Sequence, residues 1–348
     1  MKKRLLSLSF LLATSLALFA QVPQTAPAAK QIPIQSVDTA YTGVATLKIL
    51  ASFAQVTIVN SETSTLSLKA SLTANEKVPG FSLSHKLVAG NLEIVVNYPS
   101  NNWVTHSGDI SLMVPKGVSI EIENTSGYLR INNATDLTVN ALTTSGKIFV
   151  EGCKGDYALR STSGDISILK NEGNLTLVTS SGAVVARENK GKLDMTNLSG
   201  ENMVIIHNGD IVAESTSGKL IFEQIYGNLS AKSASALIKV SRIVGDLNIK
   251  SFSGTVDMFD TKGSISTQSG AGKQMGNRIL LRGNSKFVST EGSIKIKFTN
   301  QLSEFTFKLL SETGFIQAGT ESKKKKLNFG KGAILVESMS TTGGQVFN

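Results

Sequence analysis

The sequence predicts an all-β fold, a single-chain parallel β-solenoid (β-helix) with 18-residue coils. Three observations predict it: glycines recur every nine residues, a serine precedes every second glycine, and apolar residues alternate with polar ones after each glycine. The composition agrees, because the 348 residues include 31 glycines but only 6% aromatic residues. Short strands joined by tight turns use such a mixture, whereas long helices do not.

A column of small residues marks the repeat. Steps of nine residues from Gly146 meet glycine at every position but one, Ala236. The column is Gly146, Gly155, Gly164, Gly173, Gly182, Gly191, Gly200, Gly209, Gly218, Gly227, Ala236, Gly245, Gly254, Gly263 and Gly272. Such a column predicts a turn that needs positive φ, or coils that approach too closely for a Cβ atom.

A second column doubles the period to 18 residues. Serine precedes every other glycine, at Ser145, Ser163, Ser181, Ser199, Ser217, Ser235 and Ser253. No histidine or acid recurs with these serines, so the pattern does not indicate nucleophiles. We expect their hydroxyls to satisfy backbone groups at the turns.

Strands follow the glycines. Apolar residues recur two and four places after each glycine, as at Ile148 and Val150 or Leu175 and Leu177. Alternation with a period of two predicts a strand with one face inside. Each nine-residue half then holds a five-residue strand and a four-residue turn. One half cannot bury its apolar residues alone, so stacked coils must form a continuous core.

The repeat also divides the chain. Residues 108–272 form the regular β-solenoid. Residues 36–107 and 273–348 still alternate but lose the nine-residue spacing, which predicts irregular β caps at both ends. Residues 21–35, with Pro23, Pro27 and Pro33, are typical of a linker.

The first residues predict export. Residues 1–20 combine a basic start, Lys2 to Arg4, with an uncharged apolar stretch, which is typical of a secretory signal peptide. An uncleaved membrane anchor is the alternative. No later stretch is long and apolar enough for a transmembrane span. We therefore expect an exported protein at the cell surface, in the periplasm or outside the cell.

Charge and cysteine content exclude some partners. The net charge of +9 is modest for this length, and no basic stripe interleaved with aromatic residues predicts nucleic-acid binding. The sharpest basic cluster, Lys323–Lys326, is interpreted as a solvated loop, with a polyanion contact as the alternative.

Cys153 is the single cysteine of the chain, so no internal disulfide can form, and we expect a buried thiol.

The sequence predicts no catalytic, cofactor-binding or metal-binding residues. A calcium-binding β-roll needs paired glycines and a repeated aspartate, but the acids beside the glycines are scattered, at Asp156, Asp165, Asp210 and Asp246. A hexapeptide acyltransferase has a period of six and a catalytic histidine. Here His85, His106 and His207 are isolated, and we expect them at the surface or in turns. A β-helical polysaccharide lyase or hydrolase needs carboxylates gathered on one face, whereas these outward positions mix both signs.

Two phrases resemble a known family. The sequence resembles the bacterial β-strand-repeat family named "putative adhesin" in two segments. The first is V-P-K-G-V-S-I-E-I, Val114 to Ile122, and the second is the coil sequence R-S-T-S-G-D-I-S-I-L at 160–169. Members of this family are domains of unknown function related to head-GIN adhesin-like domains. The resemblance covers roughly residues 40–348. It implies a solenoid fold and an adhesin-like role, and it implies no catalytic residues.

These observations favour a non-catalytic interaction protein of the cell envelope or surface, an adhesin-like scaffold with a glycan or a surface protein as candidate partner. The alternative is a structural or stress-signalling component of the periplasm or envelope without an external ligand. A carbohydrate-active β-helix enzyme is a remote alternative. Handedness, faces per coil, oligomeric state and mode of anchoring do not follow from the sequence.

Overall fold

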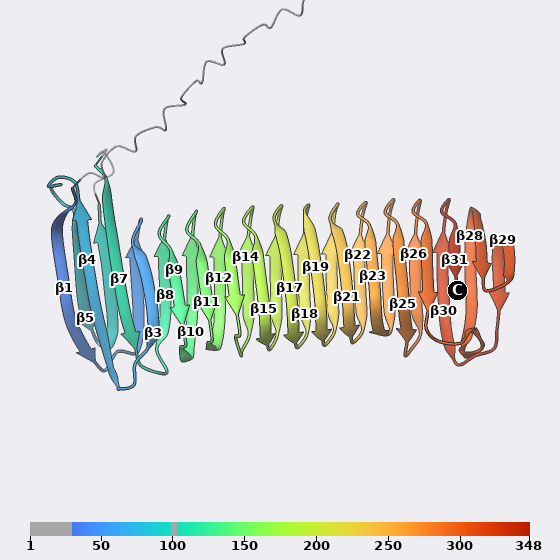
Figure 1. The fold of residues 1–348 in the computed structure, drawn as a ribbon, viewed down its shortest axis with the longest axis horizontal. Coiled ribbons are helices and arrows are strands. Elements are labelled where there is room, and N and C mark those ends of the chain that lie inside the picture. Colours follow the sequence, from blue (N-terminus) through green and yellow to red (C-terminus); the bar gives the residue numbers. More distant parts are fainter. Residues whose placement is uncertain (1–29, 99–103) are drawn as a thin grey trace, which may run out of the picture.

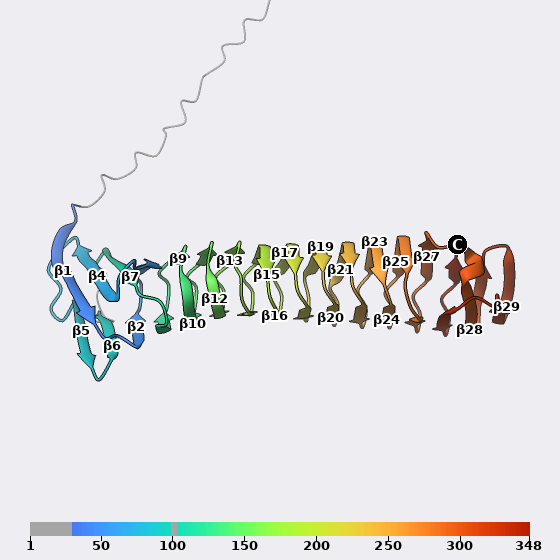
Figure 2. The same cartoon turned by 90° about the horizontal axis from the view of Figure 1, so that it is seen from below.

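The computed structural model describes residues 30–98 and 104–348, so the predicted signal peptide and residues 21–29 of the predicted linker lie outside the described residues. They form a rod of stacked coils, in which each regular coil contributes two strands (Figures 1 and 2). Strand n pairs in parallel with strand n+2 through the middle of the rod. The predicted parallel β-solenoid with 18-residue coils is confirmed, and the structure adds that each coil has two faces.

The two faces are two parallel sheets. The odd-strand sheet contains β9 (Leu129–Asn132), β11 (Ile148–Glu151), β13 (Ile166–Leu169), β15 (Val184–Lys190), β17 (Glu201–Asn208), β19 (Lys219–Tyr226), β21 (Leu237–Val244), β23 (Val256–Gly263), β25 (Gln274–Leu281) and β27 (Ile294–Phe298). The even-strand sheet contains β8 (Ser119–Asn124), β10 (Thr135–Thr143), β12 (Lys154–Ser161), β14 (Leu175–Thr179), β16 (Leu193–Asn197), β18 (Ile211–Ser215), β20 (Leu229–Ser233), β22 (Leu247–Ser251), β24 (Ile265–Ser269) and β26 (Ser285–Ser289).

The core lies between these sheets. Ile148, Ile166 and Val184 stand in register on β11, β13 and β15, and all three are buried. The same alternation fills the interior along the rod and forms one hydrophobic cluster. Stacking therefore buries side chains that a single coil would leave in water.

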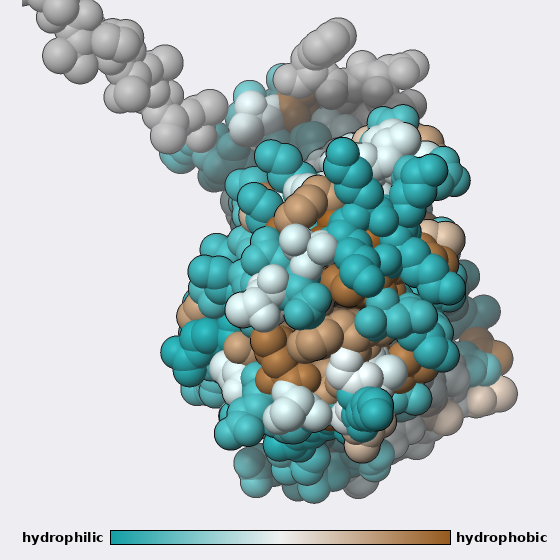
Figure 3. Space-filling model, turned by 90° about the vertical axis from the view of Figure 1, so that its right-hand side faces the viewer, coloured by the Kyte–Doolittle hydropathy of each residue, from teal (hydrophilic) through white to brown (hydrophobic). Residues whose placement is uncertain are grey.

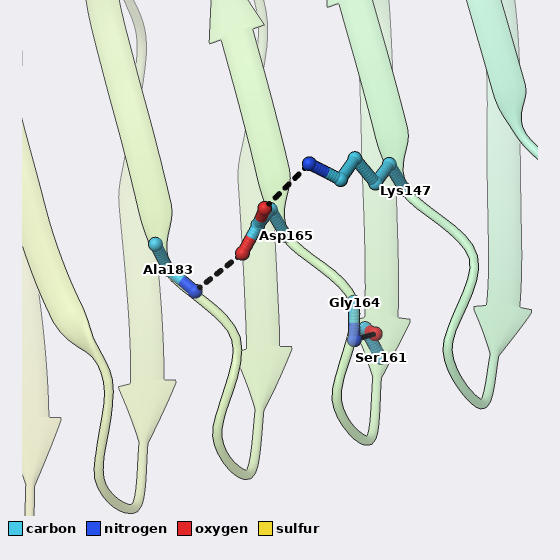
Figure 4. Close-up of polar contacts among 5 residues, drawn as sticks. All are labelled: Lys147, Ser161, Gly164, Asp165 and Ala183. Carbon is cyan, nitrogen blue, oxygen red and sulfur yellow. Dashed lines mark hydrogen bonds and ion pairs between the residues drawn. The ribbon is translucent and has the colours of Figure 1, made fainter. Parts of the chain in front are cut away.

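One corner of each coil is a tight turn capped by a side chain. The backbone N–H of Gly164 donates to Ser161 Oγ at 2.8 Å (Figure 4), and the N–H of Gly182 donates to Thr179 Oγ1 at 3.1 Å. A Cβ on Gly164 would overlap the carbonyl oxygen of Gly146 in the preceding coil. Glycine is required here because the coils approach closely.

The other corner is a bend inside a continuous strand. A single residue with positive φ bends each strand there, as Glu188 does in β15 (φ 54°) and Ile206 in β17 (φ 55°). The strand continues beyond the bend, so β17 reaches eight residues. The predicted five-residue strand and four-residue turn are therefore wrong for this half of the coil. Its glycine column combines both constraints, because Gly191 has φ +125° and a Cβ would overlap the Gly173 carbonyl oxygen.

The N-terminal coils are stacked out of sequence order. The odd-strand sheet continues from β9 through β3 (Gln55–Asn60), β7 (His106–Val114) and β4 (Thr65–Ala74) to β1 (Ile32–Thr42). The even-strand sheet continues from β8 through β2 (Thr46–Ala51) and β6 (Asn91–Asn97) to β5 (Ser82–Val88). The β2–β3 coil thus lies between two coils that follow it in the chain.

The end of the predicted linker belongs to the cap. Residues 32–35 lie in β1, not in an extended linker. Gln35 fixes this segment, because its side-chain amide donates to the Leu83 carbonyl at 2.8 Å and accepts from the Leu83 N–H at 2.8 Å. Pro33 is tolerated because β1 is an edge strand, where a missing N–H breaks no ladder.

The C-terminal cap repeats the inserted arrangement. After the 3-10 helix η1 (Leu302–Glu304), β28 (Phe305–Ala318) and β29 (Glu321–Phe329) form an antiparallel hairpin at the end of the rod. The chain then returns, and β30 (Ile334–Ser340) and β31 (Gln345–Phe347) insert between β28 and the β26–β27 coil. Lys323–Lys326 therefore lies in strand β29, and the predicted loop is wrong. The prediction that these lysines are solvated is confirmed, since all four are exposed.

Candidate binding groove on the turn edge

A groove runs along the edge of the even-strand sheet, parallel to the rod axis. Its volume is about 670 Å³, and it spans the ends of β16, β18, β20, β22 and β24 with the turns that follow them. Neighbouring strands are about 4.8 Å apart, so the groove repeats its geometry at that interval. We call it the turn groove.

One side of the turn groove is polar. It is formed by the last outward-facing residue of each strand, namely Thr196, Glu214, Lys232, Lys250 and Gln268. Lys232 Nζ and Glu214 Oε1 form an ion pair at 2.8 Å. Among the described residues Lys250 has no ion-pair partner. The groove therefore offers a cation, amides and hydroxyls to a ligand.

The other side is formed by the turn residues that project outward between the capping side chain and the glycine. Most of these are small or carry hydroxyl groups, as Thr216 and Ala234 do. Phe252 departs from this pattern, because 77% of it is exposed. Gly270 leaves room beside the ring, with Phe252 Cδ2 3.8 Å from the position that a Cβ would take.

The local sequence explains why Phe252 stands outward. Ser251 is buried, donates its hydroxyl to the Gly254 carbonyl at 3.2 Å and accepts from the Gly254 N–H at 3.0 Å. These bonds close the turn around Phe252 and hold its side chain away from the core. Phe252 could have been found from the sequence, because an aromatic residue stands out among turn residues that are mostly small or carry hydroxyl groups.

The serine column has the structural role that the sequence predicted. Hydroxyls of six of the seven serines donate to a backbone carbonyl in the preceding coil, as Ser199 Oγ does to Ser180 O at 3.2 Å and Ser253 Oγ to Ala234 O at 3.2 Å. The other donors are Ser145, Ser181, Ser217 and Ser235. These hydroxyls connect successive coils.

The scattered acids also connect coils. Asp165 forms an ion pair with Lys147 at 3.2 Å and accepts the Ala183 N–H at 3.1 Å (Figure 4). The hydrogen bond from Ala183, aided by Lys147, lowers the pKa of Asp165. Asp156, Asp210 and Asp246 likewise accept a backbone N–H from the next coil. In the described part of the chain, no three His, Cys, Asp or Glu side chains are arranged to hold a metal ion.

The histidines are not brought together. His85 is exposed on β5 and contacts the Tyr41 hydroxyl, while His106 stacks on Tyr98 with ring centroids 3.9 Å apart.

For His207, the prediction of a surface or turn residue is wrong. It lies within β17 at 1% exposure, neither ring nitrogen has a hydrogen-bond partner of normal geometry, and burial lowers its pKa. It stands inward because it occupies a core column whose next members are Ile225 and Ile243.

Cys153 is buried as predicted. Its Sγ lies 3.2 Å from the Glu151 carbonyl oxygen, and burial raises the pKa of the thiol. A thiol held protonated inside the core is a poor nucleophile.

Among the described residues, no helix is long and apolar enough to cross a membrane.

Part of the sequence matches a known family model. Residues 52–218 match Toastrack DUF4097. The match confirms the resemblance to a β-strand-repeat family of unknown function. This Toastrack region contains the first part of the turn groove, up to Thr216, and the groove continues beyond it to Thr290.

Several solved structures are similar at low identity. A "putative adhesin" from Parabacteroides merdae is 12% identical, with a TM-score of 0.38 over 75% of this chain and 95% of that one. A "putative adhesin" from Bacteroides fragilis is 12% identical, with a TM-score of 0.29 over 92% and 99%. A "putative cell adhesion protein" from Clostridium sporogenes is 11% identical, with a TM-score of 0.19 over 90% and 99%. None of the curated proteins matches this sequence.

Proposed function

We propose that the chain is a non-catalytic, exported, adhesin-like scaffold that binds a linear glycan along the turn groove. The observation that carries the proposal is Phe252, an exposed aromatic ring beside Lys250, Gln268 and a row of turn hydroxyls. An aromatic face packs against the apolar face of a sugar ring, while amides, hydroxyls and a cation bind its polar rim. The groove presents similar residues at the spacing of the coils, which suits a linear glycan because its sugar units also repeat.

The rod supports this function mechanically. Each coil is tied to the next by a parallel backbone ladder and by side-chain bonds between coils. The groove geometry is therefore fixed before a ligand arrives, which reduces the entropy lost on binding.

Glycan binding is tested with purified protein on an array of bacterial and host polysaccharides. We expect binding to at least one linear glycan, and we expect Phe252→Ala to weaken that binding at least ~10-fold, as loss of a central aromatic anchor does. Phe259→Ala is the matched control, since Phe259 is an exposed ring on the odd-strand sheet. Equal effects of the two variants, or no glycan bound, would contradict the proposal.

Location is tested by protease treatment of intact cells. We expect the mature chain to be lost from whole cells, and its N-terminus, determined by mass spectrometry, to begin after the predicted signal peptide. Protection until the outer membrane is permeabilised would instead support the alternative function, a structural or signalling component inside the envelope.

A further inference from the structure

The outer surface of the odd-strand sheet carries a run of apolar residues that the core does not use. Phe149, Leu169, Val185, Met203, Ile205 and Ile221 occupy outward positions on the five adjacent strands β11 to β19, and each is half-buried. We call them the outer apolar face. At about 4.8 Å between strands, the face extends about 20 Å along the rod.

The continuous apolar run ends after β19, although Phe259 on β23 and Met275 on β25 are separate exposed apolar residues farther along the same sheet. Beyond β19, the next strands place Lys239 and then Asp257 in register with Ile221 on the same outward column. A parallel sheet with an apolar outer surface is ordinarily covered by another layer. In the described chain no element covers this surface, because the other strands extend the two sheets. An exposed apolar patch with a polar rim marks an interaction site.

The charges on this face are arranged symmetrically about β17. Arg187 on β15 and Glu223 on β19 stand in register with Ile205, one strand away on either side. Val185 and Ile221 flank Met203 in the same way. Glu223 also contacts Arg242, while Arg187 has no ion-pair partner among the described residues. A rotation of 180° about a line along β17 therefore exchanges Arg187 with Glu223 and Val185 with Ile221.

We propose that this face binds a second copy of the chain, with the two rods antiparallel and the twofold axis along β17. Each Arg187 then faces Glu223 of the other copy, and each Val185 faces the other Ile221. Met203 and Ile205 lie on the axis and meet their own counterparts. Such an isologous interface is the commonest form of homodimer. It buries the apolar side chains near the axis, and the two symmetric ion pairs lie on either side of the axis. The turn groove lies on the other sheet, so both copies keep it open.

The oligomeric state tests the proposal directly. Sedimentation equilibrium of the purified mature chain should show a dimer that dissociates on dilution. Ile205→Lys should give a monomer, because it brings two charges together on the axis. Val212→Lys, at an outward position of β18 on the even-strand sheet, is the matched control and should leave the dimer unchanged. A monomer at all concentrations, or a dimer unaffected by Ile205→Lys, would overturn the proposal.

Two further variants test the symmetry itself. Ile205→Cys should form a disulfide-linked dimer under mild oxidation, since the twofold axis places the two side chains together. Ser230→Cys on the even-strand sheet should not. Arg187→Glu should weaken dimerisation at least ~10-fold, and adding Glu223→Arg should restore it. A dimer that forms without Ile205→Cys cross-linking, or without rescue by the second charge reversal, would contradict the twofold arrangement along β17. Circular dichroism checks that each variant is folded.

Discussion

At the residue scale, small side chains let the coils approach one another. We call the half of the glycine column that contains the serine-preceded positions the turn column (Gly146, Gly164, Gly182, Gly200, Gly218, Ala236, Gly254 and Gly272). A Cβ on a glycine of this column would overlap a backbone carbonyl oxygen of the preceding coil, as on Gly182 with the Gly164 oxygen. Ala236 occupies this column, and the structure shows how it fits. In the coil before it, Gly218 has φ +116°, and its carbonyl accepts the Leu237 N–H at 3.2 Å. The other glycines of the turn column, from Gly146 to Gly272, do not have positive φ. A local change in the backbone at Gly218 therefore accompanies the alanine in the next coil.

Substitution of a turn-column glycine should destabilise the folded chain. We expect Gly164→Ala to lower the free energy of unfolding by about 3 kcal/mol, because the Cβ must displace the backbone of the neighbouring coil. Ala236→Gly is the control and should cost less than about 1 kcal/mol, through backbone entropy. Urea unfolding followed by far-ultraviolet circular dichroism measures both. Equal midpoints for the two variants would contradict the steric explanation.

The buried imidazole of His207 should make stability depend on pH. Burial lowers its pKa, so on acidification the unfolded chain binds a proton before the folded chain does. Stability should therefore be intact above about pH 6.5 and fall as the pH drops below that unfolded-state value.

His207→Ile should remove this dependence. We expect the variant to be more stable than the wild type by about 1–2 kcal/mol at pH 5.5, because isoleucine leaves no unpaired polar atom in a column that continues with Ile225 and Ile243. Thermal unfolding between pH 5 and pH 8 measures the effect. His85→Gln, an exposed control, should keep the wild-type dependence. The same acid loss in His207→Ile and the wild type would show that other groups cause it.

At the element scale, β29 protects the end of the rod. A parallel solenoid ends in unpaired strand edges, which invite stacking of another chain. Lys323 stands in register with the buried Ile316, so it is placed on the inward column, where a further coil would bury it. Figure 3 shows this end of the rod, where hydrophilic residues surround the hydrophobic ones. A charge that would be buried on stacking opposes end-to-end association.

Removal of these charges should allow filaments. We expect Lys323→Ile combined with Lys324→Thr to form end-to-end polymers that are visible by electron microscopy and raise light scattering at micromolar concentration. Lys308→Thr removes a lysine from an outward position of β28 and should remain free of polymers. If the double variant stays as soluble as the control, β29 does not protect the edge through its lysines.

At the scale of the whole molecule, stability should be close to a sum over neighbouring coils. Almost every strand pairs only with the coil before and the coil after it, as in other repeat proteins. The ends differ, because at each end a coil is inserted between two others. Such an insertion links segments far apart in the sequence and clamps the outer hairpins onto the rod.

Deletion of residues 333–348 should therefore have a local effect. Without β30 and β31, β28 loses its parallel partners, so hydrogen exchange should accelerate in β26 to β29. Amides of β14 to β18 should keep their wild-type protection, because their neighbours are unchanged. Acceleration throughout the rod would show that the C-terminal coil controls the stability of the whole stack.

The sequence by itself determined the repeating unit. The glycine and serine columns and the alternation after each glycine predicted the parallel solenoid, the 18-residue coil and the inward positions, because these features depend on contacts that recur at one fixed spacing. Only the tertiary structure decided the insertion of β2–β3 and β30–β31, the strand at Lys323–Lys326 and the burial of His207. Each depends on which distant segments pair, and the local pattern does not specify that. The turn groove and the outer apolar face likewise exist only after stacking, because each is assembled from single residues that lie 18 positions apart in the chain and side by side on the rod.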